Sequence, residues 1–113
     1  MDCIFCKIAG GQIPSSIVYE DAELIAIKDI NPAAPVHILI IPKAHIDSLD
    51  QASEKDIQLL GHIQLVAAQL AREHKTAESG YRIVNNCGEG GGQSVFHVHY
   101  HLLGGREMQW PPG

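Results

Sequence analysis

Long uninterrupted apolar runs and an amino-terminal export signal are both missing from this sequence. The most apolar stretches, such as PVHILIIPK, are broken by His, Pro or Lys and are too short to cross a bilayer. The first residues, MDCIFCKIAGG, lack a basic segment followed by a long apolar one, so a signal peptide is not expected. An odd number of cysteines, three, then favours reduced thiols and a cytoplasmic location over a disulfide framework.

Basic residues are also scarce. The sequence has 8 Lys and Arg against 13 Asp and Glu, which gives a formal net charge of −5. The basic residues are scattered along the chain, whereas duplex nucleic acid or an anionic membrane requires a basic patch. Neither is therefore expected as a main partner. Backbone N–H groups could still hold a small phosphate ligand without net positive charge.

Internal repeats, low-complexity tracts and linkers are absent too, so residues 1–113 are expected to form a single domain. A hydrophobic fraction of 45% is sufficient for a folded core. Turn and breaker residues divide much of the chain into one short helical turn and five strands. These elements are expected at Ile4–Ile8 for the turn, and at Ile17–Glu20, Leu24–Lys28, Val36–Ile41, Tyr81–Asn86 and Val95–Leu103 for the strands.

One long helix is expected from Glu54 to about His74. Ser53, with Asp56 three residues later, is a suitable amino-terminal cap. An apolar stripe along this helix is formed by Leu59, Ile63, Val66 and Leu70. The whole pattern predicts an α+β fold with a five-stranded antiparallel sheet, one long helix and a short amino-terminal helix.

Three histidines, His97, His99 and His101, alternate with apolar residues in the last predicted strand. Residues two apart face the same side of a strand, so the imidazoles should share one face and the apolar residues the other. One metal ion bound by all three is a poor explanation, because His97 and His101 begin ~13 Å apart at ~3.3 Å per residue. The simplest alternative is a hydrated sheet face that happens to carry histidine.

A glycine loop directly precedes these histidines. Gly90, Gly91 and Gly92 let backbone N–H groups approach an anion, and Gln93 and Ser94 add side-chain donors. On its own, GGGQS is equally typical of a flexible hairpin loop. Beside a row of imidazoles it indicates phosphate chemistry, because a neutral imidazole can attack phosphorus while its neighbours stabilise charge.

The pattern HVHYHLL resembles that of the histidine triad (HIT) superfamily. The run GGQSVFHVHYHLLGGREMQWPPG is similar to its branch of histidine triad nucleotide-binding proteins, which are purine nucleoside phosphoramidases. DINPAAPVHILIIPKAHI and IFCKIAGGQIPSSIVYED resemble that branch too, so the resemblance covers essentially the whole chain. It implies a HIT-like fold and a homodimer joined through long helices and fourth strands. It also implies hydrolysis of adenosine or guanosine phosphoramidates to AMP or GMP plus an amine, through a covalent nucleotidyl-histidine intermediate.

The resemblance also implies roles for individual residues. His99 would be the nucleophile, His97 and His101 would bracket it, and His37 would complete the histidine cluster. Nucleotide-binding positions, besides His99 and His101, would be Asp29 at the ribose hydroxyls, Ile30 against the purine, and Asn86, Gly92, Gln93 and Ser94 around the phosphate.

Cys3 and Cys6 form a Cys-x-x-Cys pair, which could be half of a zinc site, a redox pair or two buried apolar residues. Many bacterial members of the resembled superfamily hold zinc with this pair, the His after IPK and the first triad histidine. The matching histidines are His45 and His97. Two cysteines and two histidines suit a closed tetrahedral structural site. Other members of the branch lack the cysteines, so zinc is not needed for the chemistry.

Two further functions remain open. A sister branch with the same triad hydrolyses dinucleoside polyphosphates, and a zinc-stabilised nucleotide-binding protein could serve regulation without catalysis. The WPPG tail favours the phosphoramidase branch. The intact triad disfavours a pure binder, which has no need of an uncharged central nucleophile.

Overall fold

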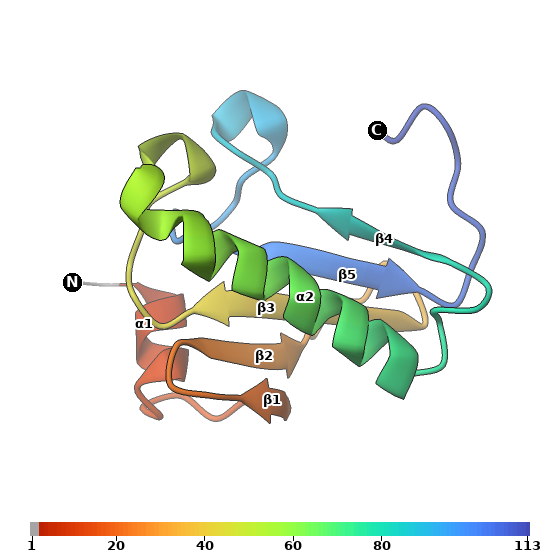
Figure 1. Ribbon diagram of the computed structural model, residues 1–113, viewed down its shortest axis with the longest axis horizontal. Helices are drawn as coiled ribbons and strands as arrows, with labels where there is room; N and C mark the ends of the chain where they lie inside the picture. Colours follow the sequence, from red (N-terminus) through yellow and green to blue (C-terminus); the bar gives the residue numbers. More distant parts are fainter. Residues whose placement is uncertain (1–2) are drawn as a thin grey trace.

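A five-stranded antiparallel sheet carries helices on both faces in this computed structural model, which describes residues 3–113 (Figure 1). The sheet order is β1-β2-β3-β5-β4. The strands are β1 (Ile17–Glu20), β2 (Leu24–Lys28), β3 (Val36–Pro42), β4 (Tyr81–Val84) and β5 (Tyr100–Gly104). The helices are α1 (Ile4–Ala9) and α2 (Ile57–Glu73), with short 3-10 turns at Leu49–Gln51, Glu54–Asp56 and Glu89–Gly91. The predicted α+β architecture is confirmed.

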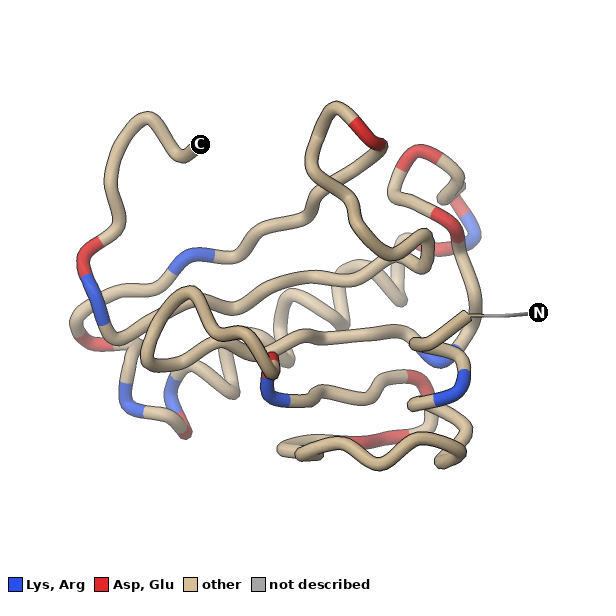
Figure 2. The backbone as a smooth tube through the Cα atoms, turned by 180° about the vertical axis from the view of Figure 1, so that it is seen from behind, with Lys and Arg blue, Asp and Glu red and all other residues tan. Residues whose placement is uncertain are grey.

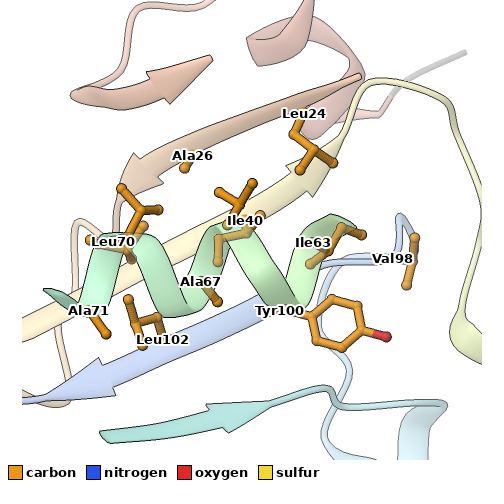
Figure 3. Close-up of a cluster of buried hydrophobic side chains, with 12 residues drawn as sticks. Leu24, Ala26, Ile40, Ile63, Ala67, Leu70, Ala71, Val98, Tyr100 and Leu102 are labelled. Atoms are coloured by element: carbon orange, nitrogen blue, oxygen red, sulfur yellow. The ribbon is translucent and has the colours of Figure 1, made fainter. Parts of the chain in front are cut away.

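Alternation along the central strands separates two apolar layers. In β3, Ile38 and Ile40 pack toward α2, whereas Leu39 and Ile41 pack toward α1. Successive side chains of a strand point to opposite faces, so one strand supplies both layers. Figure 3 shows the α2 layer, in which side chains from β2, β3 and β5 meet the buried face of the helix. The opposite face, beneath α1, is the one that carries the histidines.

Helix α2 closes over the sheet through the predicted apolar stripe. Ile63, Val66 and Leu70 are all buried on it. The predicted cap is present, because the Ser53 N–H donates to the Asp56 carboxylate at 3.0 Å. The regular helix begins three residues later than predicted, because Glu54–Asp56 forms a tighter 3-10 turn.

Two of the predicted strands are too long. β5 begins at Tyr100 rather than Val95, and β4 ends at Val84 rather than Asn86. The Val98 N–H donates to the carbonyl of Ile46 at 2.6 Å, so the segment before β5 bonds to the loop after β3 instead of a strand. Alternation predicted the faces of these residues correctly but not where the hydrogen-bonded ladder starts.

The structure also shows where the few basic residues lie and how apolar the helices are. Figure 2 shows Lys and Arg at separate places around the backbone rather than gathered on one face. Within residues 3–113, neither helix combines the length and the apolar character needed to cross a membrane.

Candidate functional site

The predicted histidine cluster forms on the α1 face of the sheet. His97, His99 and His101 share that face, although only His101 lies within β5, and the apolar residues between them pack toward α2. His37 joins them from β3, where it pairs with Leu103, two residues beyond His101. The ring centroid of His101 lies 5.1 Å from that of His37 and 5.1 Å from that of His99.

The backbone determines which nitrogen of His99 carries the proton. Its Nδ1 lies 2.8 Å from the main-chain carbonyl oxygen of His97, which can only accept a hydrogen bond. The proton therefore sits on Nδ1, and Nε2 keeps a free lone pair. This is the tautomer that a nucleophilic imidazole requires.

A second chain of hydrogen bonds sets the tautomers of His37 and His101. The Ala33 N–H donates to His37 Nδ1 at 2.9 Å, so the His37 proton is on Nε2. That Nε2–H then donates to His101 Nδ1, also at 2.9 Å. His101 is left with its own proton on Nε2, as a neutral donor beside His99.

Burial keeps these imidazoles neutral near pH 7. It is the main cause that lowers the pKa of His37 and of His99. The Asp29 carboxylate opposes it in part at His37, and at His99 the hydrogen bond to the His97 carbonyl and then Asp29 oppose it in part. For His101, burial and then the neighbouring His99 and His37 lower the pKa to about 4. The rings of His37, His99 and His101 are therefore uncharged near pH 7, as an imidazole must be in order to act as a nucleophile.

An apolar cavity of about 440 Å³ opens between α1 and the end of β2. Asp29 and Ile30 lie on it, and Ile30 is 92% exposed. The Asp29 carboxylate accepts from the Asn31 N–H at 2.8 Å and lies 3.4 Å from His37 Nε2, so this cavity adjoins the histidine cluster. Its apolar wall includes Phe5, Ile8, Ile27 and Leu39.

The glycine loop is held by Gln93, whose side chain is 6% exposed. Its Nε2 donates to the carbonyls of Asp47 at 2.7 Å and Val95 at 3.0 Å, and its Oε1 accepts from the Gly88 N–H at 2.8 Å. The carboxamide predicted to contact phosphate is thus engaged within the protein. Gly92 adopts φ +87°, a left-handed conformation that favours glycine.

The other predicted phosphate residues flank this loop. Ser94 is exposed at its end, and Asn86 is partly buried just beyond β4.

The predicted zinc ligands converge at the start of α1. Their four ligand atoms all lie within 4.8 Å of one another. His97 Nδ1 is 3.3 Å from Cys3 Sγ, 3.5 Å from Cys6 Sγ and 3.0 Å from His45 Nδ1. Bonds of ~2.3 Å to sulfur and ~2.0–2.1 Å to nitrogen place tetrahedral ligand atoms ~3.3–3.8 Å apart, close to these separations. The cluster fits a structural zinc ion.

The outer hydrogen bonds of the two histidines support a cation at this position. His97 Nε2–H donates to the Pro42 carbonyl at 2.7 Å, and His45 Nε2–H donates to the Asp47 carboxylate at 2.6 Å. Both Nδ1 atoms then carry lone pairs, only 3.0 Å apart. Two facing lone pairs repel unless a cation lies between them, and an outer acceptor on each ring is typical of zinc-bound histidine.

A second group, Asp29, His37 and His101, also brings its polar atoms within 4.8 Å. It fits a metal poorly. The Ala33 N–H occupies His37 Nδ1, and the His37 proton on Nε2 prevents that nitrogen from acting as a ligand. This group is a hydrogen-bond relay.

Sequence reasoning missed two residues that contact His99. Asn85 Nδ2 donates to the main-chain carbonyl of His99 at 3.0 Å. The Phe5 ring lies edge-on to the His99 ring, with centroids 4.9 Å apart. Asn85 lies within the predicted strand Tyr81–Asn86 and Phe5 within the predicted helical turn Ile4–Ile8, and nothing in the sequence pattern marks either as a neighbour of His99.

Comparisons with known proteins agree with this geometry. Residues 2–110 match the family described as "Scavenger mRNA decapping enzyme C-term binding". The chain is 52% identical over 112 residues to a 14 kDa zinc-binding protein of Zea mays, covering 97% of this chain and 87% of that relative.

Many solved structures are similar to this chain, among them a hydrolase and a zinc-bound protein. A HIT family hydrolase from Legionella pneumophila Philadelphia 1 is 51% identical, with 99% of this chain and 100% of that chain covered and a TM-score of 0.98. A zinc-bound histidine triad family protein from Mycobacterium smegmatis is 31% identical, with 100% and 81% covered and a TM-score of 0.81. The predicted HIT-like fold is confirmed, and the chain belongs to the histidine triad (HIT) family.

Proposed function

We propose that this protein hydrolyses purine nucleoside phosphoramidates, releasing AMP or GMP and an amine, through a nucleotide bound covalently to His99. One observation carries the proposal: the Nδ1–H of His99 is held by the His97 carbonyl at 2.8 Å, which leaves a lone pair on Nε2. Burial lowers the pKa of that ring, so the lone pair is available at neutral pH. A neutral imidazole held in one tautomer is suited to attack phosphorus.

The reaction divides into two displacements. In the first, His99 Nε2 forms a bond to phosphorus, the P–N bond breaks, and the nitrogen leaves as an amine after taking a proton from solvent. In the second, water attacks phosphorus, the bond to Nε2 breaks, and the proton lost by the water returns to solvent. His101, with its proton on Nε2, stabilises the negative charge of the phosphoryl oxygens in both steps.

The nucleoside would occupy the apolar cavity beside this cluster. Its volume of about 440 Å³ is in the range of small-ligand sites. A carboxylate has two oxygens with about four lone-pair sites, so Asp29, which lies at the cavity and accepts from the Asn31 N–H, can also accept from both hydroxyls of a ribose. Ile30 would then cover the purine. Backbone N–H groups near Gly92, with the side chains of Asn86 and Ser94, would surround the phosphate, while Gln93 holds the loop in shape.

Zinc would have a structural role. Bound by Cys3, Cys6, His45 and His97, it would cross-link the start of α1 to the segments that follow β3 and precede β5. His99 is not among the four ligands, so the chemistry would proceed without a metal at the reacting atoms.

A homodimer fits the edge of the sheet. β4 is the last strand in the sheet order, so one side of it has no neighbouring strand within the described chain. An unpaired edge favours pairing with a second copy. Leu65 of α2 is 73% exposed, a large apolar side chain that a partner would cover. A mass measurement by light scattering would give a dimer, and Leu65→Glu would shift it toward monomer.

Turnover of a fluorogenic adenosine phosphoramidate tests the activity. The wild type should cleave it, and His99→Ala should lose at least about 1,000-fold in kcat, because the nucleophile is removed. His62→Gln is the matched control. His62 lies on α2, on the face of the sheet away from the histidine cluster, where it pairs with Asp21. Faster cleavage of a dinucleoside polyphosphate would indicate the sister activity. AMP binding with no cleavage of either substrate would indicate a regulatory binder.

A further inference from the structure

Helix α1 is held in place from two sides. It has six residues, a length that is not stable alone in water. At its start, Cys3 Sγ lies 3.3 Å from His97 Nδ1, and Cys6 Sγ lies 3.3 Å from His45 Nδ1. Its apolar side chain Phe5 is 6% exposed and packs into the layer beneath the sheet. The position of α1 therefore depends on both the metal cluster and the apolar layer.

Phe5 connects the metal cluster to the nucleophile. It lies between the two cysteines in sequence, and its ring is edge-on to both His97 and His99, with centroids 6.0 Å and 4.9 Å apart. A shift of α1 away from the sheet would remove this ring from His99. Through Phe5, the zinc ligands on α1 and the reacting imidazole belong to one packed unit.

The same helix forms a wall of the apolar cavity. Ile4, Phe5 and Ile8 all line it, opposite the segment that contains Asp29 and Ile30. A base seated in the cavity would press against α1 and hold it against the sheet. Zinc would hold α1 in that same place, because the thiolates of Cys3 and Cys6 must stay close to His45 and His97 in order to share the ion with them.

We propose that zinc and a purine nucleoside bind to this chain with positive coupling, transmitted by α1, and that Phe5 is the positioning residue that carries it. The inference rests on the proposed nucleotide site. Each ligand favours the docked position of α1, so each raises the affinity for the other by the same factor. Zinc is then a structural ion whose retention depends on whether the cavity is filled.

The test measures zinc affinity by competition with a chromogenic chelator, on zinc-loaded protein with and without saturating adenosine. Adenosine is the probe because it lacks a phosphate that could bind zinc itself. Typical couplings between sites change affinity about 5- to 150-fold, so zinc should bind at least about 5-fold more tightly with adenosine present. Phe5→Leu keeps the site apolar but removes the ring, and should reduce the effect to less than about 2-fold.

Matched variants separate coupling from stability. Ile41→Val trims a fully buried side chain in the same apolar layer, at a position that does not line the cavity, and should keep the full effect. Phe5→Met, with a side chain of similar reach, serves if Phe5→Leu does not fold. The wild-type measurement needs no variant at all.

Three outcomes would overturn the inference in distinguishable ways. Unchanged zinc affinity while calorimetry shows adenosine bound would remove the coupling and leave the proposed function intact. Full coupling in Phe5→Leu would remove Phe5 as its carrier. No binding of adenosine or AMP to zinc-loaded protein would remove the proposed nucleotide site together with the coupling.

Discussion

The main-chain carbonyl of His97 accepts the Nδ1–H of His99 at 2.8 Å, while the His97 ring itself lies against Cys3 and Cys6. Two histidines separated by one residue thus belong to different centres, and a backbone oxygen joins them. Both ring nitrogens of His97 are engaged, Nδ1 with the metal cluster and Nε2 with the Pro42 carbonyl. Its side chain is therefore unavailable to a substrate, and in the proposed reaction His97 would orient its neighbour His99.

Asn85 should matter for catalysis more than for stability. Its side chain donates to the His99 carbonyl, which lies just before β5 and so outside the hydrogen-bonded part of the sheet. Its own Oδ1 is buried without a partner in the described chain, so Asn85→Leu removes an unpaired polar atom as well as a donor. We expect a fall of about 10-fold in kcat with little change in KM, measured on the phosphoramidate, and a melting temperature close to that of the wild type.

Asn85→Asp sharpens this prediction. It keeps the shape but places a carboxylate against a carbonyl that needs a donor, so kcat should fall further than in Asn85→Leu. Gln64→Leu, at an exposed position on α2 with only a local bond to the Leu60 carbonyl, is the control. Equal kcat in all four proteins would show that Asn85 does not position His99.

Gln93 should be required for the stability of the glycine loop. In Gln93→Glu the Oε1 contact can survive, but both Nε2 donors to the Asp47 and Val95 carbonyls are lost and a negative charge replaces them. Buried groups left without partners cost about 1–3 kcal/mol each, so unfolding by urea should show a loss of at least about 2 kcal/mol. A loss below about 0.5 kcal/mol would contradict the role of this carboxamide in holding the loop.

Acid should destabilise the protein through His101. Its pKa is lowered from 6.5 to about 4 by burial and the neighbouring histidines. Between these values the unfolded chain binds a proton that the folded chain does not. The contribution to stability is therefore complete above pH 6.5 and is lost as the pH falls toward about 4.

The measurement is the free energy of unfolding in urea across that interval. His101→Asn, which does not titrate there, should show a shallower slope with pH than the wild type. Parallel slopes for the two proteins would mean that other groups dominate the acid response.

Removal of one thiolate should weaken zinc binding. Metal analysis of wild-type protein purified without chelator should give about one zinc per chain, and Cys6→Ser should retain much less, because three ligands bind more weakly than four. Cys87→Ser is the control, since this exposed cysteine lies outside the cluster. Undiminished zinc in protein with both Cys3→Ser and Cys6→Ser would place the ion elsewhere.

Periodicity and residue type made part of the fold and of the candidate site predictable from the sequence. Alternation placed His97, His99 and His101 on one face, and the family resemblance assigned His45 to the two cysteines. The sequence could not show that β5 begins only at Tyr100, because Val98 bonds to a loop carbonyl that no periodicity reveals. Nor could it show that the Gln93 side chain turns into the protein, where its Nε2 donates to backbone carbonyls.

Attack by His99 on phosphorus is tested most directly by locating the site of covalent attachment. Zinc-loaded wild-type protein is mixed with an adenosine phosphoramidate, quenched within one turnover, digested and analysed by mass spectrometry. We expect one adenosine monophosphate group on the peptide that contains His99, assigned by fragmentation to that residue and absent from His99→Ala. An adduct on His101 or on any other residue, or full turnover by His99→Ala, would contradict it.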